Sequence, residues 1–212
     1  MERILCVLIG YICGLFQTSY LYGKVHGIDI RNYGSGNAGT TNALRTLGAK
    51  AGAITLLGDC FKCVIAVVIV HLIFGKSHPE MIRLLGLYAA AGTILGHNFP
   101  FYLKFKGGKG VACTGGMVLA VFPIVAPVSI GIFIATTAVT KYVSLGSILG
   151  LISVFVQVVL YGQLGIIAIP TAVCTEFYIL TACFTVLGIW QHRANIGRLM
   201  NGTENKFGSK KK

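Results

Sequence analysis

The sequence predicts an all-α integral membrane protein, and three features of the chain lead to this fold class. First, 55% of the 212 residues are hydrophobic, 11% are charged, and the mean hydropathy is +0.77. Second, several runs of about twenty or more residues carry almost no charge, which is the length that an α-helix needs to cross a bilayer. Third, the glycine- and lysine-rich motifs lie between these runs. Soluble domains do not have this combination.

Five apolar runs divide the chain and define its candidate transmembrane segments. The first run holds nineteen residues without a charge. As an α-helix it would rise about 28 Å, which nearly spans a hydrocarbon core of about 30 Å. The runs are Ile4–Tyr22, Ala51–Phe74, Leu84–Leu103, Gly110–Thr140 and Tyr142–Gln191.

The two longest runs each contain a predicted break. Tyr142–Gln191 has room for two full helices, with a turn predicted near Tyr161–Gln163. Gly110–Thr140 contains two prolines near Phe122–Pro127, and proline interrupts a helix, so two short helices forming a hairpin are predicted there. The chain then has seven transmembrane helices, or five if the hairpin does not cross fully. Both numbers are odd, so the termini are predicted to lie on opposite sides.

The basic residues are distributed unevenly between the two ends of these runs. Fourteen Lys and Arg residues fall in segments 24–50 and 104–109, at position 141 and after Gln191, whereas three fall at the opposite ends. The positive-inside rule therefore predicts that the N-terminus lies outside and the C-terminus is cytoplasmic. The net charge of +12 then reflects anionic lipid or an anionic substrate. A nucleic-acid partner is not expected, because the basic residues form no aromatic-lined domain.

A glycine-rich segment, Asn32–Gly48, follows the first apolar run. It contains Gly34-x-Gly36-x-x-Gly39, the spacing of a dinucleotide-binding fingerprint, but that fingerprint requires a preceding strand, and a membrane span precedes it here. Glycine backbone and short polar side chains suit an anion instead. A helix is predicted over Thr41–Leu47, with its N-terminus near that anion. The candidate binding residues are Ser35, Gly36, Asn37, Gly39, Thr41, Asn42 and Arg45.

Three further segments on the predicted cytoplasmic face carry the same kind of side chains. Gly96–Ala112 places two glycines between lysines directly before an apolar run, which suits a phosphate. Lys141–Ser147 adds a serine hydroxyl, and His192–Asn205 begins with a histidine and an asparagine that share one face if the segment is helical. Together with the first segment they predict one composite anion site. The candidate residues are His97, Lys104, Gly107, Gly108, Lys109, Ser144, His192 and Asn195.

Two other features concern the predicted membrane interior. Asp59 and Lys62 lie three positions apart in an apolar run, where an isolated charge is costly, so a structural ion pair near the site is predicted. Glycines at four-residue spacing indicate close packing of helices. These glycines are Gly10 and Gly14, Gly92 and Gly96, and Gly146 and Gly150.

In chain order, these motifs resemble the PlsY family, the bacterial membrane acyltransferases that acylate glycerol 3-phosphate from an acyl-phosphate donor. The resemblance rests on Gly34–Asn42, Arg45, Gly96–Ala112, Lys141–Ser147 and the HRANIGRL and GTE stretches near the C-terminus. It covers nearly the whole chain and implies one integral membrane acyltransferase domain over residues 1–212. It also implies a multi-pass location in the bacterial cytoplasmic (inner) membrane, with the active site facing the cytoplasm.

The resemblance implies that an acyl group passes from acyl phosphate to glycerol 3-phosphate. The products would be 1-acyl-glycerol 3-phosphate (lysophosphatidic acid) and phosphate, in the first step of phospholipid synthesis. Because an acyl phosphate is already activated, the main task is to position two anions, and no cofactor or metal is expected. The Gly36–Asn42 loop would lie against the acyl phosphate, and the acyl chain would occupy a groove open to membrane lipid. The residues implied to be catalytic are Ser35, Arg45, Lys104, His192 and Asn195, which would bind glycerol 3-phosphate together with Ser144.

The group that accepts the proton of the attacking hydroxyl is not fixed by the motifs. His97 and His192 titrate in a suitable range when unperturbed, and Asp59 is a third candidate if it is buried. Substrate assistance, in which a substrate phosphate accepts the proton, is the favoured version, because the motifs supply many cations and few bases.

Three other protein classes fit the sequence less well. Acyltransferases that use acyl-CoA or acyl carrier protein carry a His-x-x-x-x-Asp pair, and His97 is followed at that distance by Tyr102. Phosphatidyl-alcohol transferases need several metal-binding aspartates, whereas this chain has Asp29 and Asp59 alone. A small organophosphate transporter is the main alternative to an enzyme. Against it, the polar loops gather on one membrane face and the chain has no internal repeat.

Overall fold

The computed structural model describes residues 1–208, which are helical or irregular throughout, with no strand in that range. The chain divides into two compact units, Met1–Val121 and Phe122–Lys212, called unit 1 and unit 2 below. The all-α prediction is confirmed. Lys210, Lys211 and Lys212, which contributed to the predicted charge asymmetry, lie outside the described residues.

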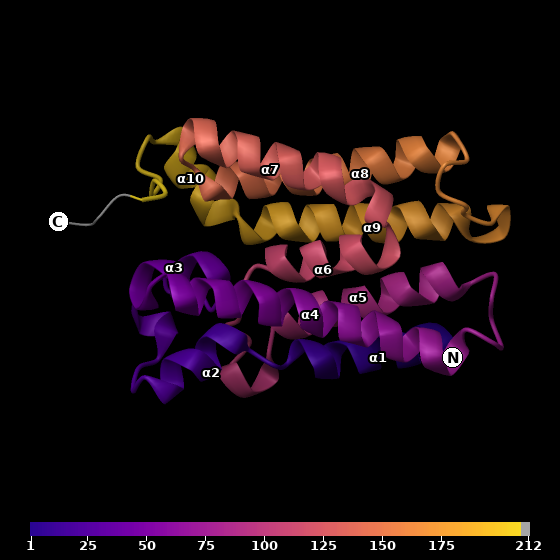
Figure 1. The fold of residues 1–212 in the computed structure, drawn as a ribbon, viewed down its shortest axis with the longest axis horizontal. Coiled ribbons are helices and arrows are strands. Elements are labelled where there is room, and N and C mark those ends of the chain that lie inside the picture. Colours follow the sequence, from indigo (N-terminus) through magenta and orange to yellow (C-terminus); the bar gives the residue numbers. More distant parts are fainter. Residues whose placement is uncertain (209–212) are drawn as a thin grey trace. The chain divides into compact units, whose positions relative to one another are not determined.

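Unit 1 is built around a set of long helices that pack side by side. Helix α1 packs against α5 and α4, while α4 also packs against α3, α5 and α6. The short helices α2 and α3 lie at the end of this unit opposite the N-terminus (Figure 1). The elements are α1 (Glu2–Gly14), α2 (Thr18–Val25), η1 (Ile30–Asn32), α3 (Thr40–Leu47), α4 (Ala49–Phe74), α5 (Ile82–Asn98), η2 (Phe101–Leu103) and α6 (Val111–Val121).

Glycines allow α1 and α5 to meet backbone against backbone. A Cβ atom added to Gly10 would overlap the carbonyl oxygen of Ala89, and one added to Gly92 would overlap that of Val7. One turn further along, Gly14 and Gly96 approach each other in the same way. The close packing predicted from their four-residue spacing is therefore confirmed.

Unit 2 contains three long helices in sequence, followed by a short one. Helix α8 packs against both α7 and α9. Buried Gln157 of α8 donates a hydrogen bond of 2.8 Å to the hydroxyl of Ser129 in α7. Phe122 packs edge-on against Phe177 of α9, with ring centroids 5.8 Å apart. The elements are η3 (Pro123–Val125), α7 (Ala126–Thr140), α8 (Val143–Gln163), α9 (Thr171–Gln191) and α10 (Arg193–Met200).

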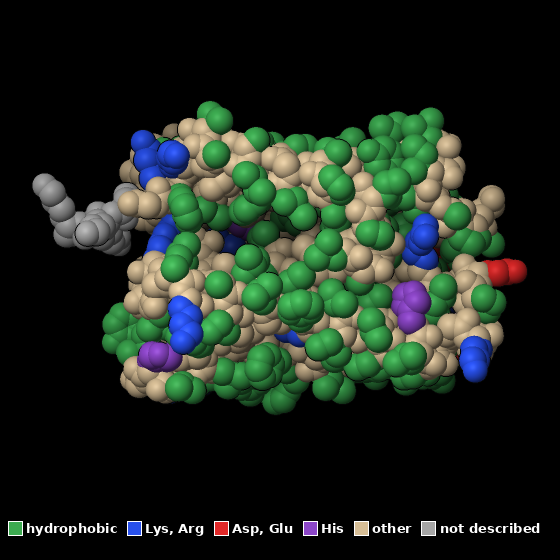
Figure 2. Space-filling model, in the orientation of Figure 1, with side chains coloured by type: hydrophobic (Ala, Val, Ile, Leu, Met, Phe, Trp, Pro, Cys, Tyr) green, Lys and Arg blue, Asp and Glu red, His purple; other side chains and the backbone are tan. Residues whose placement is uncertain are grey.

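Five helical segments of the described chain are long and apolar enough to cross a membrane. Their outward surface is apolar: the side chains of Leu72 and Val139 are 79% and 83% exposed. Figure 2 shows hydrophobic side chains spread along the helices, with most charged ones toward the helix ends. Such a surface is suited to lipid rather than to water. The segments are Glu2–Val25, Ala49–Phe74, Pro123–Thr140, Val143–Gln163 and Thr171–Gln191, and Val111–Val121 is a shorter apolar helix.

The predicted breaks are partly confirmed. α6 ends at Val121 and η3 begins at Pro123, so the break near Phe122–Pro127 is present. The two helices predicted within Tyr142–Gln191 are present, but the turn between them begins slightly later than predicted, because α8 continues through Gln163 and the connection to α9 follows it. That connection contains Gly165 at a φ of 72°, a conformation that glycine adopts readily.

The third apolar run also ends earlier as a helix than predicted. α5 stops at Asn98, whereas the apolar run was expected to extend to Leu103. The residue before a proline is disfavoured in the helical conformation, and Phe99 before Pro100 adopts a φ of −130° and a ψ of 58°. The chain therefore leaves α5 in time to form the loop that carries the second glycine motif.

Candidate active site

The first glycine loop of unit 1, residues 33–39, leads directly into α3. This helix begins at Thr40 with Gly39 as its N-cap, so the helix predicted over Thr41–Leu47 is confirmed to within one residue. Thr41 and Arg45 are four positions apart and therefore lie on the same side of α3. Arg45 and Ser35 are both exposed, so their polar groups are accessible from the surface of the unit.

Asn42 shapes the glycine loop from within α3. Its Oδ1 atom accepts a hydrogen bond of 2.8 Å from the backbone N–H of Ser35, and its Nδ2 donates to the carbonyls of Ile30 and Tyr33 at 3.1 and 3.0 Å. The side chain is 2% exposed. Gly34 has a φ of 59°, and a Cβ atom there would overlap Asn42 Oδ1. The amide of Asn42 is thus occupied with holding the loop in its conformation.

The second glycine loop, residues 104–110, is hydrogen-bonded to the end of α5. The backbone N–H groups of Gly107 and Gly108 donate to the carbonyls of Asn98 and His97 at 3.2 and 3.0 Å. A Cβ atom on Gly107 would overlap the His97 carbonyl oxygen. One on Gly108 would overlap the His97 ring and lie 3.0 Å from the carbonyl oxygen of Ala38. The two glycine loops therefore meet at Gly108.

Arg31 links the two loops, although sequence reasoning did not select it. Its guanidinium donates to the carbonyl of Leu103 at 3.1 Å and forms an ion pair of 2.7 Å with Asp29. The hydrogen bonds and charge of Arg31 hold the pKa of Asp29 below its ordinary value, against a smaller opposing effect of burial. The signal available in the sequence was an acid two residues before an arginine, next to the glycine motif.

The lysines of the second loop have different surroundings. Lys104 is exposed and adopts a left-handed conformation with a φ of 56°, and Phe105 follows with a φ of 59°. Two successive left-handed residues without a glycine are unusual and give the chain a sharp turn after η2. Lys109 is half-buried close to the start of α6.

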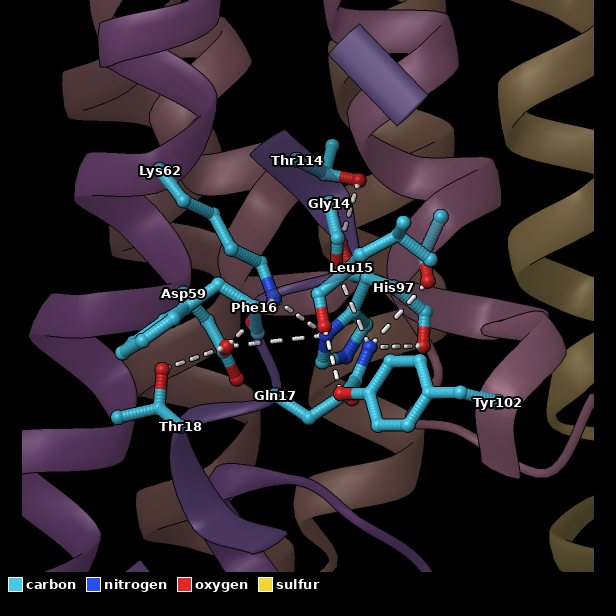
Figure 3. Close-up of polar contacts among 12 residues, drawn as sticks. Gly14, Leu15, Phe16, Gln17, Thr18, Asp59, Lys62, His97, Tyr102 and Thr114 are labelled. Atoms are coloured by element: carbon cyan, nitrogen blue, oxygen red, sulfur yellow. Dashed lines mark hydrogen bonds and ion pairs between the residues drawn. The ribbon is translucent and has the colours of Figure 1, made fainter. Parts of the chain in front are cut away.

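His97 lies in a buried polar cluster together with the predicted ion pair. Lys62 Nζ is 2.8 Å from Asp59 Oδ1, which confirms that pair. The same Nζ lies 2.8 Å from His97 Nδ1 (Figure 3). Gln17 Nε2 supports the end of α5 by donating to the carbonyls of Gly96 and His97 at 3.2 and 3.1 Å. The cluster thus connects α4 to the glycine loops through His97.

In unit 2, the predicted residues gather around Glu204. The carboxylate accepts hydrogen bonds from Ser144 Oγ at 3.1 Å, from Asn195 Nδ2 at 2.7 Å and from Arg198 Nε at 2.7 Å. Ser144 and Asn195 are therefore held by one carboxylate, as is Arg198, which lies three positions beyond Asn195 on α10. Glu204 is one of six acidic residues in the chain, and its central place among these residues was not predicted from the sequence.

Hydrogen bonding determines the ionisation of Glu204. Burial by itself would raise the pKa of Glu204, but the hydrogen bonds from Asn195, Arg198 and Ser144, with the charge of Arg198, hold it below the ordinary value. The group is therefore a carboxylate at neutral pH, as its three donors require.

His192 is oriented by the helix that precedes it. Its Nδ1 atom lies 2.8 Å from the carbonyl oxygen of Gly188, and the ring is buried. A carbonyl oxygen can only accept, so Nδ1 carries a proton and donates it. In the neutral ring, Nε2 is then an acceptor.

The structure thus places the predicted residues in two groups. Unit 1 brings together the two glycine loops, and unit 2 brings together Ser144 and Asn195 around Glu204. Among the described residues, no group of three or more His, Cys, Asp or Glu side chains could hold a metal ion.

Comparisons with known proteins identify one family. A family model described as glycerol-3-phosphate acyltransferase matches residues 4–202. A glycerol-3-phosphate acyltransferase of Clostridioides difficile (strain 630) is 43% identical over 211 residues, covering 98% of this chain and 97% of that protein. Another, from Thermoanaerobacter sp. (strain X514), is 39% identical and covers 99% of this chain and 98% of its own.

Solved structures give the same result. A crystal structure of PlsY (YgiH), an integral membrane glycerol 3-phosphate acyltransferase, in its glycerol 3-phosphate form is 34% identical. It matches with a TM-score of 0.82 over 98% of this chain and 96% of that one. The lysophosphatidic acid form matches with a TM-score of 0.80 at 32% identity. Together with the apolar helices and the glycine loops, these matches show that the chain belongs to the PlsY family of integral membrane glycerol-3-phosphate acyltransferases.

Proposed function

We propose that this enzyme transfers an acyl group from acyl phosphate to glycerol 3-phosphate, releasing lysophosphatidic acid and phosphate. The observation that carries the proposal is the meeting of two glycine loops at Gly108. The same segments of unit 1 carry the exposed basic residues Lys104, in the second loop, and Arg45, in the helix that follows the first loop. Glycine-rich backbone with nearby cations is suited to phosphate groups, and both proposed substrates carry one. The related PlsY structures are described in a glycerol 3-phosphate form and a lysophosphatidic acid form, which supports this acceptor and this product.

The reaction needs positioning more than covalent chemistry. The 1-hydroxyl of glycerol 3-phosphate attacks the carbonyl carbon of acyl phosphate, and the bond from that carbon to the phosphate oxygen breaks. The hydroxyl proton passes to a phosphate oxygen of a substrate, and phosphate leaves. Because the donor is already activated, cations that hold two anions close together supply most of the catalysis.

The residues divide into direct contacts and supports. In unit 1, Ser35, Arg45 and Lys104 bind glycerol 3-phosphate and its phosphate group, and Gly36, Asn37, Gly39, Thr41 and Lys109 lie against the acyl phosphate. In unit 2, Ser144, His192 and Asn195 are the further residues that the family resemblance implies for glycerol 3-phosphate. Asn42, Gly107 and Gly108 serve the same site by shaping the loops, since the Asn42 side-chain amide and the backbone N–H groups of the two glycines are engaged within the protein. His97, whose Nε2 atom faces Gly108, contacts substrate where the two loops meet.

The membrane topology proposed with this function has seven spans in one domain, an external N-terminus and a cytoplasmic C-terminus. In unit 1, the α2–α3 end carries seven basic residues: Lys24, Arg31, Arg45, Lys50, Lys104, Lys106 and Lys109. In unit 2, the segment 164–170 between α8 and α9 has none, whereas the opposite end has Lys141, Arg193, Arg198 and Lys206. This distribution supports a cytoplasmic active site in the bacterial inner membrane.

The donor can be tested directly with purified enzyme in lipid. Labelled glycerol 3-phosphate would be supplied with palmitoyl phosphate, palmitoyl-CoA or palmitoyl-acyl carrier protein in parallel, and labelled lysophosphatidic acid would be measured. We expect product from palmitoyl phosphate alone. Product from either of the other two donors at an equal rate would contradict the proposed donor, and no product from any donor with folded enzyme would contradict the assigned reaction.

Arg45 should contribute strongly to binding of glycerol 3-phosphate. Arg45→Ala removes a guanidinium, and a lost charge-assisted hydrogen bond of about 1.5–3 kcal/mol corresponds to a fall in kcat/KM of roughly 10- to 150-fold. Lys50→Ala is the matched control, because Lys50 is also basic and exposed and lies just beyond α3. Steady-state kinetics with varied glycerol 3-phosphate would measure both variants. An equal effect of the two substitutions would remove Arg45 from the site.

A further inference from the structure

The ammonium group of Lys62 has three partners in the buried cluster. Its Nζ atom lies 2.7 Å from the carbonyl oxygen of Phe16, 2.8 Å from Asp59 Oδ1 and 2.8 Å from His97 Nδ1 (Figure 3). An ammonium has three N–H donors and no acceptor. All three donors of Lys62 are therefore directed at these atoms, and the side chain has no hydrogen left for a substrate.

This arrangement determines where the proton of His97 lies. Because Lys62 donates, Nδ1 of His97 accepts and carries no proton, so the neutral ring is protonated at Nε2. The alternative, an imidazolium beside a neutral amine, is disfavoured because the carboxylate of Asp59 lies 2.8 Å from Lys62 Nζ but 3.7 Å from His97 Nδ1, so it compensates a charge on Lys62 better than one on His97. Protonating both groups would place two cations 2.8 Å apart against the single carboxylate of Asp59, and an uncompensated buried charge is costly.

The protonated edge of His97 faces the glycine loops. A Cβ atom added to Gly108 would overlap His97 Nε2, so this nitrogen points at the second loop. The same position lies 3.0 Å from the carbonyl oxygen of Ala38 in the first loop. Nε2–H therefore lies where the two loops meet, and Lys62 is hydrogen-bonded to Nδ1 on the other side of the ring.

We infer that Lys62, paired with Asp59, is a positioning residue that fixes the tautomer and orientation of His97 so that Nε2–H donates to a phosphate group held by the two glycine loops. The inference rests on the proposed function in taking these loops to bind a phosphorylated substrate. It assigns His97 the role of a hydrogen-bond donor. A general base at this position is excluded, because Nε2–H has no lone pair available for a proton.

The tautomer can be measured without turnover. Full-length enzyme labelled with 15N-histidine would be placed in lipid nanodiscs, and the His97 signals would be assigned by their loss in His97→Asn. We expect an unprotonated Nδ1, far downfield of a protonated Nε2, and we expect added glycerol 3-phosphate or palmitoyl phosphate to shift the Nε2 signal. A proton on Nδ1 would overturn the inference, and so would an Nε2 signal that responds to neither substrate.

A double variant tests the role of the ion pair. Asp59→Leu combined with Lys62→Met removes both charges together, so that no unpaired charge remains buried. We expect His97 to lose its single tautomer and kcat/KM to fall by about 10- to 100-fold, the range seen when the partner that orients a functional histidine is removed from metal sites. A folded double variant with the parental tautomer and parental kinetics would overturn the inference.

Thr18→Val is the matched control for this variant. Thr18 donates to the same Asp59 oxygen at 3.1 Å but has no hydrogen bond to His97. This change should preserve the Nε2–H signature and lower kcat/KM much less than the double variant does. The tautomer is read from the parental enzyme, with His97→Asn used only to assign the signals. It is therefore decided even if the double variant folds poorly or acyl phosphate is not the donor.

Discussion

Replacing Glu204 by alanine should destabilise unit 2 by about 3 kcal/mol and remove most of the acyltransferase activity. The carboxylate accepts from Ser144, Asn195 and Arg198, and its side chain is 3% exposed. Hydrogen bonds to a charged group contribute about 1.5–3 kcal/mol each and do not add fully. The share of Arg198 is reduced by solvent, because that side chain is 36% exposed. Activity should fall because Ser144 and Asn195, proposed to bind glycerol 3-phosphate, lose the carboxylate that holds them.

The pH dependence of this effect has a definite sign. The pKa of Glu204 lies below its ordinary value in the folded protein. Its stabilising contribution is therefore complete above the ordinary glutamate pKa of about 4.3 and is lost as the pH falls through the lower folded-state value. Thermal unfolding in detergent, measured from about pH 3 to 7, should show a gap between parent and Glu204→Gln that closes in acid.

Glu80 supplies the matched control for these measurements. It is an exposed acid in the connection between α4 and α5 of unit 1. Glu80→Ala therefore changes the net charge by as much as Glu204→Ala does, without removing a buried carboxylate that accepts three hydrogen bonds. We expect Glu80→Ala to unfold within about 0.5 kcal/mol of the parent. A similar destabilisation by both substitutions would show that net charge, rather than the hydrogen bonds of Glu204, is responsible.

Gly92→Ala should prevent α1 and α5 from packing as they do. A Cβ atom at Gly92 would overlap the Val7 carbonyl oxygen and lie 2.7 Å from the backbone nitrogen of Tyr11. Both neighbours are backbone atoms, so neither can move without separating the helices. Overpacking of this kind costs about 1–3 kcal/mol or more, and we expect a lower yield of folded enzyme and a lower unfolding temperature.

Gly115→Ala is the control with the opposite expected sign. A Cβ atom at Gly115 of α6 meets no heavy atom within 4 Å. A glycine-to-alanine change at such a helical position typically stabilises by about 0.4–1 kcal/mol, because it reduces the freedom of the unfolded chain. If Gly92→Ala were as stable as Gly115→Ala, the backbone contact between α1 and α5 would not contribute to stability.

The helices themselves could be predicted well from the sequence, because apolar runs and prolines act locally. The turn predicted near Tyr161–Gln163 shows where prediction from local sequence fails. Gly162 was expected to lie in a turn, yet it lies inside α8, where a Cβ atom would overlap the hydroxyl of Tyr178. The glycine serves packing between α8 and α9, and such a contact depends on tertiary structure that local propensity does not contain.

A site of glycines, short polar side chains and basic residues is a prediction from residue types, whereas the contacts that hold those residues in place could not be predicted. Asn42 and the two glycines of the second loop were candidates for substrate contact, but the Asn42 side-chain amide and the N–H groups of both glycines are engaged within the protein. Arg31 and Glu204 were not predicted as site residues. Residues of this kind are identified by the atoms that they bond, and those atoms lie far away in the sequence, at Leu103 for Arg31 and at Ser144 for Glu204. Glu204 and Ser144 lie sixty positions apart, and no periodic sequence pattern links the two residues.

The internal bonding of the two glycine loops also bears on the thermodynamics of binding. Asn42, Arg31 and the end of α5 hold these loops by hydrogen bonds within the protein. Immobilising a flexible backbone costs about 1–2 kcal/mol of conformational entropy per residue. Here that cost is met when unit 1 folds, so the site is preorganised. In the proposed reaction, the attraction between phosphate and protein is then available for holding the two phosphorylated substrates close together against their mutual repulsion.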